Sequence, residues 1–147
     1  MSGSVQSVQS NLLDNVVAAL TANTPWTAYR SRMASFPPAQ LPAFNVLPDE
    51  GEMQYLYAQS VNHLFRFKVR MMCATVDEVD KACDLLYVAG SQAILADPTL
   101  GGLAYITRWV GQKWEREGEG ELDQCALVVT FASEISTLMT DPSVQVA

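Results

Sequence analysis

The sequence is poor in the residues that most often carry chemistry. Its 147 residues include one histidine and three cysteines, and Cys73, Cys83 and Cys125 lie far apart and form no CxxC pair. An odd number of thiols without ligand spacing indicates neither a disulfide framework nor a zinc site. We therefore expect three buried free thiols, no metal and no other cofactor.

Positive charge is also scarce, since nine Lys and Arg stand against sixteen Asp and Glu, for a net charge of −7. General affinity for nucleic acid is not expected, because duplex binding depends on cations that neutralise phosphates. No apolar run approaches the roughly 20 residues that cross a bilayer. The first residues, MSGSVQSVQSNLLDN, lack the regions of a secretory signal, and we expect a cytoplasmic product with one domain, residues 1–147.

The first third of the chain predicts a helix followed by extended segments. Apolar residues recur at helical spacing from Val5 to Leu20, with polar residues between them. After the helix, residues 26–32 are short and aromatic enough for a strand. The proline-rich segment 36–42 cannot form a regular helix, so it predicts an extended connector to a short strand at 43–47.

The clearest strand is predicted between Asn62 and Ala74, after a polar turn or longer loop at residues 48–52. Apolar and polar side chains alternate along it, so one face is apolar and the other is basic at its centre. A helix follows, opened by the segment 75–78. Thr75 and Glu78 have the spacing of a capping box, in which each side chain bonds the other's backbone N–H.

The stretch ILADPTLGGL, residues 94–103, ends this second helix. A glycine pair can cradle phosphate, but such a loop precedes its helix, whereas here the helix comes first. Pro98 cannot continue a helix and disfavours helical geometry at Asp97, while Gly101 and Gly102 supply positive φ. These four residues predict a structural corner at which the chain leaves the helix and re-enters a sheet.

Two long strands close the sequence, at residues 103–114 and 124–137. Between them the segment EREGEGE, residues 115–121, predicts a mobile acidic hairpin tip. Its acidic residues are Glu115, Glu117, Glu119 and Glu121. They fit either a soluble loop or a projecting hairpin that contacts a neighbouring subunit.

The order of these elements predicts an α+β fold. The expected architecture is a mainly antiparallel sheet with two principal helices packed on one face and a long C-terminal hairpin.

No catalytic constellation is indicated. A nucleophile–histidine–carboxylate site would have to use His63, yet the sequence has no Gly-x-Ser-x-Gly elbow. His63 also falls on the apolar face of the predicted long strand. We expect it to have a packing or interface role.

Arg66, Lys68 and Arg70 occupy alternate positions of that strand, so their side chains share one face about 6–7 Å apart. Like charges at this spacing repel each other unless opposite charges lie close to them. The face is either solvated, or it meets acidic groups of a neighbouring subunit or lines a channel. Nucleic-acid binding is less favoured, because no aromatic residues interleave on that face.

This arrangement, together with DPTLGGL at 97–103 and ALVVTF at 126–131, resembles the tail terminator or tail completion proteins of long-tailed bacteriophages. The resemblance spans nearly the whole chain, although residues 48–61 and 136–147 match no pattern of the family. It implies a non-enzymatic virion protein in the neck, at the top of the tail. There a homo-oligomeric ring, commonly a hexamer, would cap the tail tube and end its polymerisation.

The partners that the resemblance implies are further copies of the chain, the tail tube protein, and the head connector or neck proteins. Genome DNA would pass through the lumen without specific binding, and no membrane is involved. The alternatives are another phage neck or tail-tube subunit, or a small cytoplasmic ligand-binding or hydrolytic domain. A ring protein predicts self-association, whereas a small enzyme predicts a closed pocket and turnover.

Overall fold

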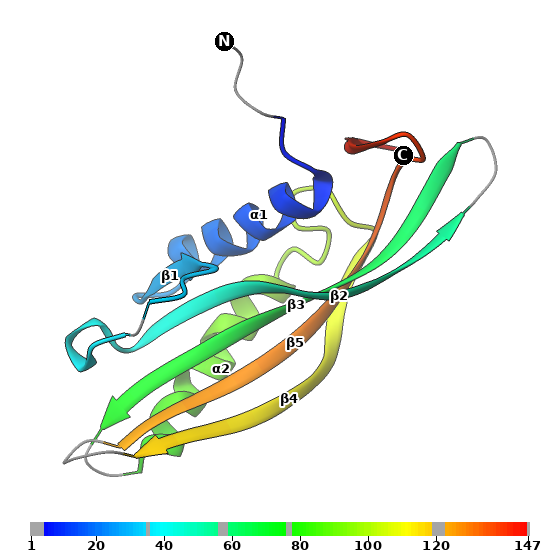
Figure 1. Ribbon diagram of the computed structural model, residues 1–147. Helices are drawn as coiled ribbons and strands as arrows, with labels where there is room; N and C mark the ends of the chain where they lie inside the picture. Colours follow the sequence, from blue (N-terminus) through cyan, green and yellow to red (C-terminus); the bar gives the residue numbers. More distant parts are fainter. Residues whose placement is uncertain (1–4, 35, 56–58, 76–77, 119–122, 147) are drawn as a thin grey trace.

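The computed structural model has two helices on one face of a curved, six-stranded sheet (Figure 1). It describes residues 5–34, 36–55, 59–75, 78–118 and 123–146. The helices are α1 (Val8–Asn23) and α2 (Val79–Leu95), with a short 3-10 turn, η1 (Pro38–Gln40). The strands are β1 (Thr27–Arg30), β2 (Ala43–Tyr55), β3 (Ser60–Thr75), β4 (Ile106–Gly118), β5 (Asp123–Leu138) and β6 (Asp141–Gln145). The predicted α+β class is confirmed.

The sheet has the order β1-β2-β3-β5-β4, and β6 pairs with β5 beside this path. Only the β1–β2 pair is parallel. The central pair, β3 and β5, is in register from Ser60–Leu138 to Thr75–Asp123. Because β1 covers β2 only from Ala43 to Val46, two stretches of edge stay open among the described strands. They are the outer half of β2 and the full length of β4.

The core lies between the helices and the inner face of the sheet. Phe65, Phe67 and Val69 point into it from β3, as the two-residue period predicts. The rings of Phe67 and Phe131 stack with centroids 5.4 Å apart and planes 15° from parallel. From α1, Leu12, Leu13, Val16 and Leu20 complete this core. Each such buried side chain contributes roughly 1.5–3 kcal/mol to folding.

Gly90 brings α2 close to the sheet. A Cβ at this position would lie 2.8 Å from Cε1 of Phe44 and 3.2 Å from Cε of Met71. The first separation is shorter than a Cβ tolerates and the second is tight, so a side chain here would force the Phe44 ring or the helix to shift. The glycine therefore permits the close packing of α2 on β2 and β3.

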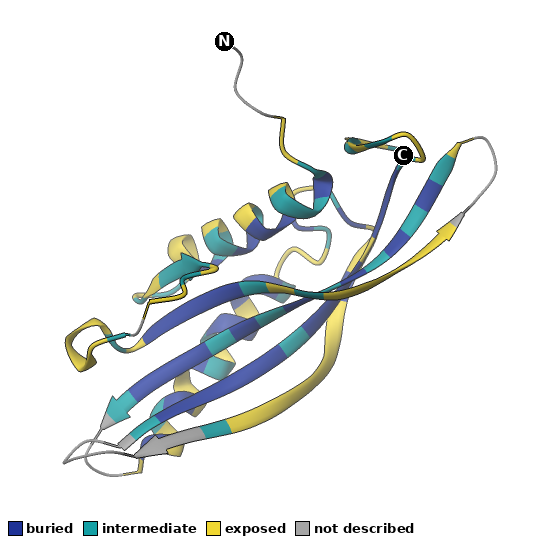
Figure 2. Cartoon of the chain, in the orientation of Figure 1, coloured by how far each residue is buried: buried dark blue, intermediate teal, exposed yellow. Residues whose placement is uncertain are grey.

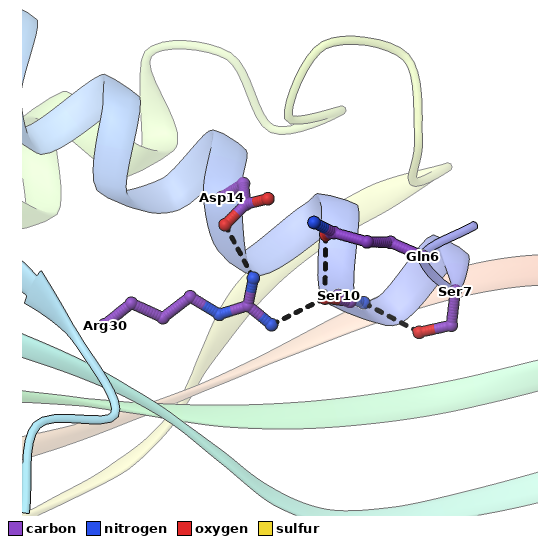
Figure 3. A network of polar contacts seen from close by, with 5 residues as sticks. All are labelled: Gln6, Ser7, Ser10, Asp14 and Arg30. Atoms are coloured by element: carbon purple, nitrogen blue, oxygen red, sulfur yellow. Dashed lines mark hydrogen bonds and ion pairs between the residues drawn. The ribbon is translucent and has the colours of Figure 1, made fainter. Parts of the chain in front are cut away.

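A polar network fixes the short strand β1 against α1 (Figure 3). Arg30 donates to Oδ1 of Asp14 at 2.6 Å and to Oγ of Ser10 at 2.7 Å. The Ser10 hydroxyl donates to Gln6, and its backbone N–H donates to Oγ of Ser7, the N-cap of α1. The first turn of α1 is thus capped and tied to the strand beside it.

The turn predicted at residues 48–52 is wrong. Strand β2 runs on to Tyr55, and the segment forms a β-bulge, because the pairing with β3 shifts register between Pro48 and Gly51. No described strand covers the outer edge of β2 here. The missing N–H of Pro48 therefore costs no ladder hydrogen bond, and the bulge absorbs the additional residues.

The predicted capping box is also wrong. Thr75 is the last residue of β3 and pairs with Asp123 of β5, so it cannot cap a helix. The residue before α2 is Glu78, which has left-handed angles (φ 47°, ψ 47°) and makes no side-chain cap. Its carboxylate accepts a hydrogen bond from Nζ of Lys81 at 3.2 Å instead.

The hairpin tip is shorter than predicted. Strand β4 continues to Gly118 and β5 begins at Asp123, so Glu115 and Glu117 belong to the ladder. The remaining two acidic residues of the predicted tip, Glu119 and Glu121, lie outside the described residues.

Candidate assembly surface

The corner between α2 and β4 is organised by the carboxylate of Asp97. One carboxylate oxygen accepts from the hydroxyl and the N–H of Thr99, at 2.6 Å and 3.1 Å, and the other accepts from Gly101 N–H at 2.9 Å. These hydrogen bonds, that of the Thr99 hydroxyl foremost, lower the pKa of Asp97. Gly101 and Gly102 have φ of 76° and 82°, which glycine adopts without a Cβ clash.

This corner also joins separate parts of the chain. Nδ2 of Asn15 on α1 donates to the carbonyl of Leu100 at 2.8 Å. Nε2 of Gln145 on β6 donates to the carbonyl of Gly102 at 2.7 Å. The corner therefore holds α1, the end of α2 and β6 together, which is a structural role.

Valine at either corner glycine is expected to lower the free energy of unfolding by about 1–3 kcal/mol, because a β-branched residue is strained at positive φ. Gly101→Val should be the more damaging change. Its Cβ would lie 2.8 Å from Nδ2 of Asn15, which must move and give up its hydrogen bond to Leu100. Gly102 has open space around the same position. Urea unfolding of both variants measures the difference, and equal midpoints for both variants and the parent would contradict this account.

His63 is buried between α1 and the end of β5. Its Nε2 lies 2.9 Å from Oγ1 of Thr137, and its Nδ1 lies 3.5 Å from Nε2 of Gln9. The Thr137 hydroxyl also donates to the carbonyl of Leu138, so it accepts from the ring and gives it no proton. His63 therefore does not activate the Thr137 hydroxyl as a nucleophile. The structure thus gives His63 a packing role, with 6% of the residue exposed.

The stability of the protein is expected to depend on pH through this histidine. Burial lowers the pKa of His63 below its ordinary 6.5, so the unfolded chain binds the proton more readily. The stabilisation that neutral His63 gives the folded state is complete above the pKa that this residue has in the unfolded chain. It is lost as pH falls through the pKa that the residue has in the folded protein. Melting temperatures between pH 7.5 and 5 should therefore fall more steeply for the parent than for His63→Gln. Parallel curves would contradict the assignment.

The basic face of β3 points away from the core, and its three cations form ion pairs with carboxylates of the same chain. Two of these carboxylates come from the bulged half of β2 and one from β4. The ion pairs are Arg66–Glu52 at 3.2 Å, Lys68–Asp49 at 3.7 Å and Arg70–Glu115 at 3.0 Å. Contact of this face with acidic groups of a neighbouring subunit stays a prediction. The in-chain pairs already offset the repulsion between the three cations.

The three thiols are free and buried, as predicted. Although they are far apart in sequence, the fold gathers them: Cys73 and Cys125 are direct partners in the β3–β5 ladder. Sγ of Cys83 on α2 lies 3.3 Å from the carbonyl of Cys125. The hydrogen bond with Cys73, followed by burial, raises the pKa of the Cys83 thiol. Among the described residues, no three His, Cys, Asp or Glu are placed to hold a metal ion.

A hollow of about 360 Å³ lies on the outer face of the sheet, beside the segment that follows β1. Its lining includes Arg32, Phe36 and both members of the Arg70–Glu115 ion pair. The guanidinium of Arg32 stacks over the rings of Tyr29 and Phe36, at 4.9 Å and 4.2 Å. Cation–π contact and ion pairing thus engage these groups within the chain.

An exposed apolar surface lies where β4 passes α2. Figure 2 shows β4 exposed along most of its length, whereas β3 alternates between buried and intermediate residues and β5 is largely buried. Trp109 and Trp114 of β4 are 52% and 45% exposed, and Val88 of α2 is 49% exposed. A groove of about 500 Å³ between the two elements is lined by Tyr87, Val88, Ser91, Leu95 and Trp109. The sequence predicts a strand at Trp109 but contains no signal that marks this residue as part of a site.

Within the described chain, neither helix combines the length and the apolar character that spanning a membrane requires.

No protein-family model matches the chain, and no curated protein matches it. Among solved structures, the chain is similar to one in the virion of a native gene transfer agent particle. The two share 13% sequence identity, with 90% of this chain and 99% of that chain covered and a TM-score of 0.44.

Proposed function

We propose that this chain is a non-enzymatic structural protein of a phage-like virion. In this proposal it assembles into a ring at the top of the tail, where it caps the tail tube, ends tube polymerisation and offers the surface that joins the head. The observation that carries the proposal is a sheet with two open stretches of edge on opposite sides, one of them bordered by exposed tryptophans.

Open strand edges favour association, because their backbone N–H and C=O groups have no partner across the edge. Contiguous exposed apolar surface has the same tendency when it is rimmed by polar residues. When two different surfaces of one protomer meet head to tail, repetition of the contact gives a ring if the rotation closes. A protomer with unlike open edges is suited to that geometry.

The sequence resemblance adds the identity of the ring and its partners. The DPTLGGL segment forms the corner that joins α1, α2 and β6, and the ALVVTF segment forms part of the buried strand β5. By this resemblance the ring has six copies, and it contacts the tail tube protein on one side and the head connector on the other. With a net charge of −7, the chain suits a lumen through which DNA passes without being bound.

Electron microscopy of particles made with and without this chain tests the proposal. Its removal should give tails that lack heads and tubes of irregular length, and a labelled copy should appear only at the head-proximal end of the tail. Label distributed along the tube would make it a tube subunit and overturn the proposed role. Normal particles in its absence would also overturn it.

A further inference from the structure

We infer that the open edge of β4 binds the outer half of β2 in a second copy of this chain, so that neighbouring sheets join edge to edge. The closure of this contact into a ring rests on the proposed function. The contact itself rests on the pattern of side chains along the two edges.

The β4 edge carries aromatic groups on one face and positive charge on the other. Trp109 and Trp114 are paired with Phe131 and Leu127 of β5, so their side chains lie on the helix side of the sheet. Lys113 is paired with Val128, which places it on the outer side. Among the side chains that the structure describes, no carboxylate lies within ion-pair distance of Lys113.

The outer half of β2 presents the complementary pattern. Met53 is paired with His63, so it lies on the helix side, and it is 65% exposed. Residues 48–55, PDEGEMQY, contain three acidic groups and no cation. Glu52 lies on the outer side, paired in the ladder with Leu64. Glu50 is exposed and has no ion-pair partner among the described residues.

When the two edges lie side by side, like faces meet. Met53 of one copy then reaches the groove at Trp109 of the next, where a thioether packs well against an aromatic ring. On the outer side, Glu52 approaches Lys113, and Glu50 lies near it in the bulge, so the charges are opposite. Because of the bulge at Pro48, only the last residues of β2 form a regular strand edge. Side-chain contacts, rather than backbone hydrogen bonds between the two edges, therefore make up most of this interface.

A charge swap tests this pairing of edges. Sedimentation velocity of the full chain over a concentration series, in low and moderate salt, gives the strength of self-association. Lys113→Glu and Glu50→Lys should each weaken it about tenfold, and combining them should restore it to within about threefold of the parent. Trp109→Ser should also weaken association. Lys81→Glu, which makes the same charge change at the start of α2, is the matched control and should associate like the parent.

Each other outcome is informative, provided that circular dichroism and melting show folded variants. A parent chain that stays monomeric throughout the series would overturn the inference. So would parent-like association of Lys113→Glu and Trp109→Ser. If Lys113→Glu weakens association and Glu50→Lys does not, the partner surface is not the outer half of β2, as in a two-fold contact between β4 edges, and the inference is overturned. If both weaken it and the double variant stays weak, Lys113 and Glu50 do not face each other, which also overturns this pairing of edges. If the charge swap restores association but microscopy does not find this chain at the top of the tail, the inferred contact is supported and the proposed function is overturned.

Discussion

Replacing Phe67 with alanine is expected to lower the free energy of unfolding by about 3–5 kcal/mol. Phe67 is completely buried at the centre of β3, and its ring stacks on Phe131 of β5. The substitution removes the apolar contacts of the ring and leaves a cavity beneath both helices. Because β3 and β5 are paired along their whole length, they have little freedom to collapse into it.

Urea unfolding of Phe67→Ala beside Phe67→Leu measures this effect. Leucine retains most of the apolar volume and should cost well under half as much. A loss below about 1 kcal/mol for the alanine variant would show that this part of the sheet is not the packed centre of the fold.

Replacing Arg66, Lys68 and Arg70 together with glutamate is expected to destabilise the subunit by about 2–4 kcal/mol. The change removes three ion pairs with in-chain carboxylates and sets like charges against each other at all three places. The pairs are partly exposed, so each is worth at most about 1 kcal/mol, and each new repulsion costs a similar amount. The net charge of −7 also becomes −13, since three losses of +1 and three gains of −1 change it by −6.

Two controls separate the contributions to this effect. Glutamine at the same three positions removes the ion pairs without adding repulsion, so it should cost about half as much. Lysine at Glu52, Asp49 and Glu115 in the triple-glutamate background should recover part of the loss, because opposite charges are restored. Added salt should narrow the difference between the parent and the triple-glutamate variant. A triple-glutamate chain that melts like the parent would show that these pairs do not form in solution.

The two central strands could be predicted from the sequence. Burial on one face imposes a strict two-residue period, so the alternation from Asn62 to Ala74 is visible without knowledge of any partner. The same reasoning placed a strand at 124–137, close to the observed β5. The positive φ of the corner was also predictable, because consecutive glycines after Asp-Pro have few other uses.

The outer half of β2 could not be predicted, because local and non-local preferences disagree there. Pro48 and Gly51 individually favour a turn. Their pairing with Phe67 and Phe65 of β3 outweighs that preference, and it becomes visible only when the register of the two strands is known. Strand β6 was missed for a related reason, since the sequence DPSVQ has no clear alternation and its position depends on β5.

The candidate surface was predictable only in part. The period of β3 identified a basic face, but its partner Glu115 was assigned to a hairpin tip, whereas it lies in β4 across the sheet. The groove at Trp109 depends on residues of α2, among them Tyr87, Val88 and Leu95, that are distant in sequence from β4. Their position beside Trp109 becomes visible only in the folded chain.

Because all three native cysteines are buried, the folded subunit should react very little with thiol-directed labels. Cys83 is entirely covered, and Cys73 and Cys125 are 1% and 6% exposed, so maleimide dyes should reach them only when the chain opens. A single cysteine introduced at Met33, which is 89% exposed and lies outside the inferred β2–β4 contact, would then carry the only reactive fluorophore attachment point of the folded subunit, with the native thiols left in place. Energy transfer between donor- and acceptor-labelled copies would follow neighbouring subunits as they meet, while delayed reaction at the native thiols would time local opening of the sheet.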